Sequence, residues 1–105
     1  MRTVSDLGYA THMEIKEERS GEKGEFYIEK NGDRVARIQF IDSAEGQIDV
    51  FHTEVDEELR GQGVGDKLVD RVVKYARDAD LKIVATCPYA KKLIERNEDL
   101  RSVLA

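Results

Sequence analysis

Four segments in the first half of the chain alternate apolar and polar residues with the period of two that is typical of β-strands. These segments are MEIKEE, EFYIEK, DRVARIQFI and GQIDVFHTEV, at residues 13–18, 25–30, 33–41 and 46–55. Asn31 and Gly32 join the second segment to the third, and both residue types tolerate a positive φ, which predicts a tight hairpin. SAEG at residues 43–46 predicts the next turn. We therefore expect an antiparallel meander of four strands, with the short first strand at its edge.

The alternation also predicts which side chains share a face of the sheet, because successive residues of a strand point to opposite sides. In the second segment, one face carries Phe26 and Ile28. In the third, one face carries Ala36, Ile38 and Phe40, and the other carries Val35, Arg37, Gln39 and Ile41. In the fourth, one face carries Ile48, Val50, His52 and Glu54.

The second half of the chain changes to the period of an amphipathic helix. The apolar stripe consists of Val64, Leu68, Val72, Tyr75, Ala76 and Ala79. LKIVATC at residues 81–87 then predicts a short strand, and Pro88 suits the first turn of a helix formed by PYAKKLIER, residues 88–96. The order β-β-β-β-α-β-α predicts an α+β (mixed α/β) fold whose last strand runs parallel to the fourth.

Composition and charge narrow the class of protein. With 105 residues, 40% of them hydrophobic and 37% charged, the chain suits one soluble globular domain. The net charge of −5 argues against nucleic-acid binding, and no apolar run is long enough to span a membrane. The single cysteine excludes an internal disulfide and fits a cytoplasmic protein, and we expect no metal site. We expect residues 1–12 to be a disordered extension or a cloning remnant, and residues 13–105 to form one compact domain, monomeric or weakly dimeric.

A glycine-rich segment, ELRGQGVGDKL, lies between the fourth strand and the helix. The first N–H groups of a helix have no internal partner, and glycines would let a phosphate group approach them closely. The alternative is a tight strand-to-helix turn that binds nothing, and the glycine spacing alone leaves both open. The P-loop motif and the dinucleotide-binding G-x-G-x-x-G fingerprint both require glycine at position 66 when aligned on Gly61. Asp66 occupies that position and excludes both.

The pattern R-x-x-G-x-G, formed by Arg60, Gly63 and Gly65, fits a different family. Following a long antiparallel strand and opening a helix, it resembles the acetyl-CoA signature [QR]-x-x-G-x-[GA] of the GNAT superfamily of N-acetyltransferases. The stretch HTEVDEELRGQGVGDKLVDRVV is similar to the short, YjdJ-type subgroup in particular. The resemblance covers residues 13–96.

The resemblance implies a sheet whose fourth and fifth strands part to admit acetyl-CoA. Backbone groups of residues 53–55 would pair with the pantetheine arm, and the amides of residues 60–65 would hold the pyrophosphate. Arg60 or Lys67 either adds a charged contact to phosphate or lies in solvent. The expected cofactor-binding residues are Thr53, Glu54, Val55, Arg60, Gly61, Gln62, Gly63, Val64, Gly65, Asp66, Lys67 and Cys87.

Three residues are candidates for the chemistry of acetyl transfer, which requires a deprotonated amine and a stabilised CoA thiolate. His52 could accept the amine proton, or could be a hydrogen-bonded structural histidine. Glu54 is a weaker candidate base or an exposed carboxylate. Cys87 is expected at the N-cap of the last helix, where the helix dipole favours a thiolate. It could act as a nucleophile or a proton donor beside His52, or could be a small buried residue.

The chain departs from the wider superfamily in two ways. Many members carry N-x-x-A-x-x-x-Y-E after the fifth strand, with the tyrosine as general acid. Aligning Ala90 and Glu95 with that pattern puts Cys87 at the asparagine and Ile94 at the tyrosine, so the usual acid is missing. Tyr89 is expected on a different helical face, as a surface or rim aromatic residue.

The second departure is the short polar segment RSGEKG, which replaces the helices that many members carry between their first two strands. The acceptor side should therefore be open to an exposed lysine or N-terminus of a protein, although small amines also fit. We expect an acetyl-CoA-dependent N-acetyltransferase; the alternative is an acyl-CoA-binding or protein-interaction module with little or no transferase activity.

Overall fold

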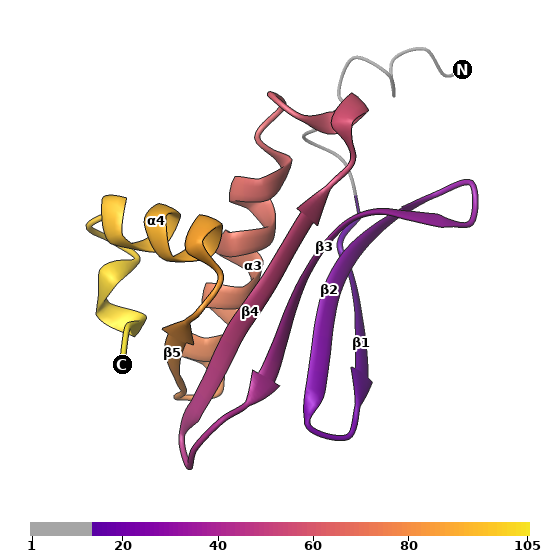
Figure 1. Ribbon diagram of the computed structural model, residues 1–105. Helices are drawn as coiled ribbons and strands as arrows, with labels where there is room; N and C mark the ends of the chain where they lie inside the picture. The colour runs from indigo at the N-terminus through magenta and orange to yellow at the C-terminus, as the bar shows by residue number, and fades with distance from the viewer. Residues whose placement is uncertain (1–13) are drawn as a thin grey trace.

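The computed structural model describes residues 14–105 and confirms the mixed α/β fold. A five-stranded sheet has the order β1-β2-β3-β4-β5, in which neighbouring strands are antiparallel except for the parallel pair β4–β5 (Figure 1). The strands are β1 (Lys16–Ser20), β2 (Lys23–Lys30), β3 (Asp33–Asp42), β4 (Gln47–Val55) and β5 (Lys82–Ala85), and the helices are α3 (Val64–Asp78) and α4 (Pro88–Arg96). Two single 3₁₀ turns, η1 (Glu57–Leu59) and η2 (Arg101–Val103), were not predicted.

Some predicted boundaries lie outside the described residues, and others differ from the structure. The expected extension at residues 1–12 and the predicted strand start at Met13 lie outside the described residues. Strand β1 begins at Lys16 and pairs through Ser20 with Lys23, so most of RSGEKG belongs to a tight hairpin rather than to a loop. Strand β5 ends at Ala85, before Cys87, because the amides of Thr86 and Cys87 both donate to the Val50 carbonyl at 3.1 Å.

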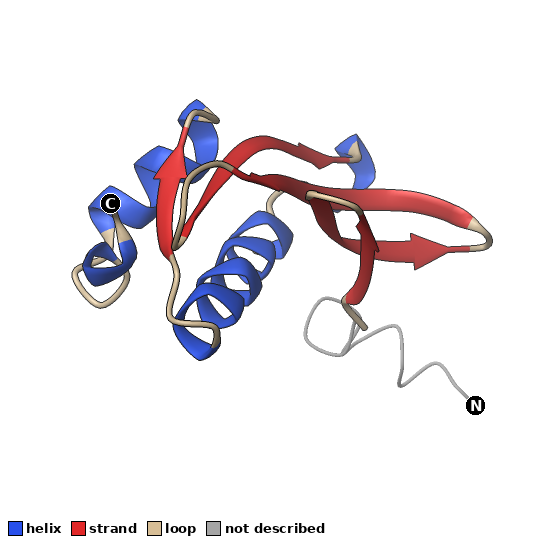
Figure 2. Cartoon of the chain, turned by 90° about the horizontal axis from the view of Figure 1, so that it is seen from below, coloured by secondary structure: helices blue, strands red, loops and turns tan. Residues whose placement is uncertain are grey.

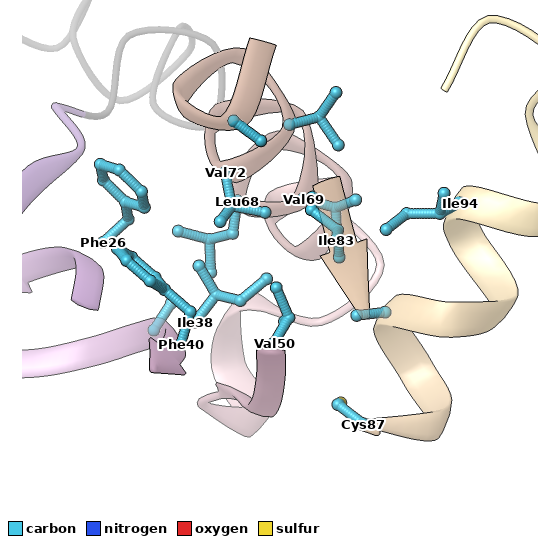
Figure 3. Packing of buried hydrophobic residues seen from close by; sticks show 14 of the residues in the cluster. Phe26, Ile38, Phe40, Val50, Leu68, Val69, Val72, Ile83, Cys87 and Ile94 are labelled. Atoms are coloured by element: carbon cyan, nitrogen blue, oxygen red, sulfur yellow. The ribbon is translucent and has the colours of Figure 1, made fainter. Parts of the chain in front are cut away.

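The hydrophobic core lies between α3 and one face of the sheet (Figures 2 and 3). Leu68, Val72 and Ala76 of the predicted stripe are fully buried, because one side of an amphipathic helix must cover the apolar face of the sheet. Phe26 and Phe40 stack with their ring centroids 5.6 Å apart on the sheet side of this contact. Helix α4 lies beside β5, and the described residues place no helix over the opposite face of β1, β2 and β3 (Figure 2).

Two bulges change the predicted faces of the strands. In the β2–β3 pair, Ile28 faces Ala36 and Glu29 faces Arg34, so Val35 is an extra residue, and both Val35 and Ala36 are buried. Simple alternation predicted Val35 and Ala36 on opposite faces, and the bulge is the reason that both are buried. A bulge inserts one residue and reverses the alternation beyond it.

The second bulge lies in β4 at Phe51. Gln39 pairs with His52 and Phe40 pairs with Val50, which leaves Phe51 without a partner in β3. Beyond the bulge, Thr53 pairs with the fully buried Ile38 and therefore faces the side of the sheet that α3 covers. We call this side the helix face and the opposite side the outer face.

Strands β4 and β5 part at the same place. Their pairing runs from Gln47 with Lys82 to Val50 with Ala85, and β4 continues for residues 51–55 without a partner in β5. Figure 1 shows β4 extending well past the end of β5. The sheet is therefore splayed between these strands, as the family resemblance implies. Among the described residues, no helix is long and apolar enough to cross a membrane.

Candidate active site

A cleft of about 620 Å³ opens between the unpaired end of β4, the glycine loop and the start of α4. Its lining includes most of the residues expected to bind the cofactor. The lining residues are Thr53, Glu54, Val55, Leu59, Arg60, Gly61, Gly63, Val64, Gly65, Asp66 and Tyr89. Leu59 and Tyr89 were not expected there, whereas the expected residues Gln62, Lys67 and Cys87 do not line the cleft.

Two glycines shape the loop because their backbone adopts positive φ. Gly61 has φ of 81° and Gly63 has φ of 77°, a region that side chains with a Cβ rarely adopt. Gly63 is the N-cap of α3, no side chain caps the helix, and Lys67 makes the first helical hydrogen bond to the Gly63 carbonyl at 3.1 Å. The amides of residues 64–66, which precede Lys67 in the first turn, have no acceptor within the helix. The N-terminus of α3 therefore presents hydrogen-bond donors at the cleft.

The third glycine of the loop, Gly65, is required for a different reason. Gly65 lies inside α3 with ordinary helical backbone, and a Cβ at this position would meet the Tyr89 hydroxyl at 1.9 Å and its Cζ at 2.7 Å. Gly65 therefore allows the first turns of α3 and α4 to approach each other with the Tyr89 ring between them. Tyr89 is 45% exposed and forms a wall of the cleft.

The environment of Tyr89 disfavours ionisation of its phenol. Burial raises the pKa of Tyr89, and the negative charge of Asp66 raises it further, whereas Arg96 lowers it. The hydroxyl is therefore a protonated donor at neutral pH.

Polar side chains near the loop fold back onto the backbone. Arg60 donates from Nε to the Val55 carbonyl at 3.3 Å, which ties the loop to the end of β4. Gln62 donates from Nε2 to the Glu58 carbonyl at 3.1 Å. Among the described residues that line the cleft, Arg60 is the one cation.

Cys87 occupies the predicted N-cap position of α4, where β4 and β5 part. Its side chain is buried, with 6% of its surface exposed, and lies at the margin of the core where α4 begins (Figure 3). Its Sγ–H donates to Thr53 Oγ1 at 3.4 Å. Thr53, rather than the expected His52, is therefore the partner of Cys87.

His52 and Glu54 do share a face, but it is not the face of Ile48 and Val50, and that part of the prediction is wrong. The bulge at Phe51 places them opposite Gln39 and Arg37 on the outer face. Glu54 accepts a hydrogen bond from Arg37 Nε at 2.9 Å. The β4 strand thus separates His52 from the helix face, where Thr53 and Cys87 meet.

Ion pairs organise the outer face near His52. Arg34 contacts Glu25 at 2.7 Å and Glu18 at 2.6 Å, and its guanidinium lies 3.7 Å above the Tyr27 ring. These contacts raise the pKa of Arg34, first through the hydrogen bond to Glu25. Gln39, which pairs with His52, donates to the same Glu25 carboxylate at 2.9 Å.

The sequence matches the model of the GCN5-related N-acetyl-transferase family over residues 25–103. The chain belongs to this family. It is 29% identical over 86 residues to Protein NATD1 of Xenopus tropicalis, with 79% of this chain and 77% of that protein covered. Among solved structures, a GCN5-like protein from Staphylococcus aureus shares a TM-score of 0.71 and 36% identity over 90% of each chain.

A more distant structure shares the fold alone. The ribosomal-protein-alanine N-acetyltransferase of Brucella melitensis biovar Abortus 2308 has 23% identity and a TM-score of 0.60, with 74% of this chain and 64% of that chain covered. Family membership makes this chain an enzyme of the N-acetyltransferase class, and acetyl transfer its type of reaction.

In this acetyltransferase, Ile94 occupies the position at which the family pattern has its tyrosine acid. The Ile94 side chain is completely buried and points into the hydrophobic core (Figure 3). Among residues 14–105, no group of histidine, cysteine, aspartate and glutamate side chains is arranged to hold a metal ion.

A like-charge pair lies on α3 beside the cleft of this acetyltransferase. Burial raises the pKa of the Asp70 carboxyl, and Asp66, one helical turn away, raises it further. Because the folded state disfavours the charged carboxylate, stability falls as the pH rises through the raised pKa. We expect Asp70→Asn to increase the free energy of unfolding at pH 7 by about 0.2–0.5 kcal/mol.

Urea denaturation at several pH values measures this gain. It should vanish below the ordinary aspartate pKa of 3.8, where the folded and unfolded states are both protonated. A gain that persists at low pH would show that charge is not its cause.

Proposed function

We propose that this chain transfers the acetyl group of acetyl-CoA to an amine, and that acetyl-CoA binds in the cleft between β4 and α3. One observation carries the proposal: the unpaired end of β4 and the uncapped N-terminus of α3 line the same cleft. The first can pair with an extended pantetheine arm as a strand would, and the second can hold a diphosphate on backbone amides.

The cleft residues suit the two halves of the cofactor. Thr53, Glu54 and Val55 offer the β4 edge to the pantetheine arm, and residues 61–66 offer amides and space to the diphosphate. Arg60 stands between the two parts, tied to Val55. Acetyl-CoA supplies the acetyl group as an activated thioester.

The amine approaches from the outer face. Thr53 and Val55 face the cleft, so the adjacent residue His52 faces the side from which an acceptor can reach β4. The amine nitrogen attacks the thioester carbonyl, a C–N bond forms, and the C–S bond breaks to release CoA as the thiolate. His52 accepts the proton that the amine loses. Glu54 is a weaker base because Arg37 holds its carboxylate.

Thr53 and Cys87 protonate the CoA thiolate. The Thr53 hydroxyl donates its proton into the cleft and accepts one from Cys87, whose Sγ–H already donates to it. Cys87 regains a proton from solvent after CoA leaves. This pair replaces the tyrosine that the family pattern places at position 94. A nucleophilic role for Cys87, with acetylation of its sulfur, is the alternative, but the side chain is buried and does not line the cleft.

Replacing Cys87 tests this role. Cys87→Ala should lower the rate of acetyl transfer about 10-fold with unchanged affinity for acetyl-CoA, because it removes a proton donor and no cofactor contact. Thr53→Val should cause a similar loss, and Thr53→Ser, which keeps the hydroxyl, should retain the rate. Equal rates in wild-type protein and Cys87→Ala across the pH range would reduce Cys87 to a packing residue.

The acceptor belongs to the class of exposed amines. The short β1–β2 hairpin leaves the outer face without a covering helix in the described residues, which supports a protein lysine, a protein N-terminus or a small amine. The same hairpin supports assignment to the short YjdJ-type subgroup. Incubation with labelled acetyl-CoA and a panel of polyamines, peptides and proteins, read by mass spectrometry, identifies the acceptor.

An acyl-CoA-binding module is the second candidate. It is supported by the position of His52 away from the cleft, by the hydrogen bond that holds the Glu54 carboxylate on Arg37, and by the buried Ile94. Calorimetry with acetyl-CoA and with CoA comes first, since micromolar binding to neither would refute both candidates. Binding without transfer to any member of the acceptor panel would favour the module.

A further inference from the structure

Tyr89 lines the cleft, although the R-x-x-G-x-G signature does not include it and the N-x-x-A-x-x-x-Y-E pattern leaves its position unspecified. It is the second residue of α4, directly after Pro88, and its ring crosses to α3. A Cβ built on Gly65 would lie 1.9 Å from the Tyr89 hydroxyl, so the hydroxyl sits against the backbone of Gly65. Gly65 is itself the second residue of α3, among the amides that have no helical acceptor.

We propose that the Tyr89 hydroxyl binds the diphosphate of the cofactor directly, as a side-chain donor added to the backbone amides of α3. This inference rests on the proposed function, because it requires acetyl-CoA to occupy the cleft. A diphosphate seated on the first turn of α3 lies beside Gly65, within reach of the hydroxyl that touches this residue.

The charges of the cleft explain why such a donor is needed. Among the described residues that line it, Asp66 is an unpaired carboxylate and Arg60 is the one cation, which is already tied to Val55, while the Glu54 carboxylate is paired with Arg37. An anionic ligand therefore gains little from charge attraction here and depends on hydrogen-bond donors. A phenol donates to a phosphate oxygen without itself being charged, and a hydrogen bond to an ionised acceptor is stronger than one between neutral groups.

The protonation state of Tyr89 agrees with this role. The pKa of Tyr89 is raised by burial first and by Asp66 second, so the hydroxyl keeps its proton at neutral pH. Groups facing it from the neighbouring elements are Asp66 on α3 and Arg96 and Cys87 on α4.

Tyr89→Phe tests the proposal, because it keeps the ring on Gly65 and removes only the hydroxyl. We compare the affinities of wild-type and variant protein for CoA and for pantetheine, which lacks the diphosphate. Titrations followed by NMR measure dissociation constants into the millimolar range. The variant should bind CoA about 10- to 100-fold more weakly and should bind pantetheine as the wild-type protein does. Tyr27→Phe, on the outer face, is the matched control and should change neither affinity.

A second variant checks the geometry. Gly65→Ala introduces a Cβ where the Tyr89 hydroxyl now lies, and the exposed ring must move away. It should weaken CoA binding to a similar extent, and the double variant Gly65→Ala/Tyr89→Phe should be no weaker than Gly65→Ala alone. Fully additive losses would overturn the proposal, because the two changes would then act on separate contacts.

The remaining outcomes separate this inference from the proposed function. Equal CoA affinity of wild-type protein and Tyr89→Phe overturns the role of Tyr89 and leaves cofactor binding intact. An equal loss for CoA and pantetheine also overturns it, since the hydroxyl would then serve the arm rather than the diphosphate. Failure of the wild-type protein to bind CoA overturns the proposed function, and the role of Tyr89 with it.

Discussion

Deletion of Phe51 should weaken the binding of acetyl-CoA about 100-fold while the protein remains folded. Phe51 is the extra residue of the β4 bulge, and the pairs on either side of it are Phe40 with Val50 and Gln39 with His52. Without Phe51 these two pairs become consecutive, so all the remaining side chains of β4 stay on the face that they occupy now. The bulge bends β4 where the pairing with β5 ends, and a straight β4 is expected to close the splay.

The expected loss follows from the contacts that the splay exposes. If the β4 edge at residues 53–55 can no longer pair with the pantetheine arm, two or three hydrogen bonds are lost. Their loss lowers the affinity for acetyl-CoA about 100-fold. Calorimetry with acetyl-CoA measures this loss, and circular dichroism and thermal unfolding show that the fold persists. Phe51→Ala is the matched control, because it keeps the bulge and should keep the affinity. A deletion variant that binds acetyl-CoA like the wild-type protein would contradict the link between bulge and cleft.

Gly63→Val should lower both stability and cofactor affinity, whereas Gly21→Val should lower stability alone. Both glycines have positive φ, 77° and 61°, and both have open space where a Cβ would lie. A β-branched residue forced into this region costs about 1–3 kcal/mol of the free energy of unfolding. The two variants therefore carry a similar strain at different places, the N-cap of α3 and the β1–β2 turn.

Only the strain at Gly63 acts on the cleft. To relieve it, the backbone of the N-cap must rotate and turn the first amides of α3 away from the diphosphate. Losing two such donors should weaken acetyl-CoA binding by about 30-fold. Urea denaturation and calorimetry measure the two effects separately. Equal affinity losses in both variants would mean that general destabilisation, and not the orientation of the first N–H groups of α3, controls binding.

The order of the elements could be predicted from the sequence because each depends on local patterns. The period of two, Asn31-Gly32 and the stripe of α3 are all visible within short windows, and α4 begins at Pro88 as expected. The faces of β4 could not be predicted, since the bulge at Phe51 is a property of its pairing with β3. Simple alternation placed His52 with Val50, and the single inserted residue moved it to the outer face.

In the glycine loop, too, features that depend on local sequence could be predicted and features that depend on distant contacts could not. Its position between strand and helix depends on local sequence and was predicted, and its binding of phosphate stays a prediction. The reason for Gly65 was not, because it depends on Tyr89, which approaches from another helix. Cys87 was correctly placed at the N-cap of α4, but its partner is Thr53, since the bulge had already exchanged the faces of Thr53 and His52. The contact between Gly65 and Tyr89 and the contact between Cys87 and Thr53 both join segments that are distant in the sequence, so residue type alone did not predict them.

We propose that the N-terminus of α3 and the free edge of β4 together bind acetyl-CoA. Titration of the isotope-labelled protein with acetyl-CoA, followed by amide NMR, tests it most directly. We expect the largest shifts at the amides of residues 61–66 and 53–55. An absence of shifts, or shifts confined to the outer face around Arg34 and Gln39, would contradict it.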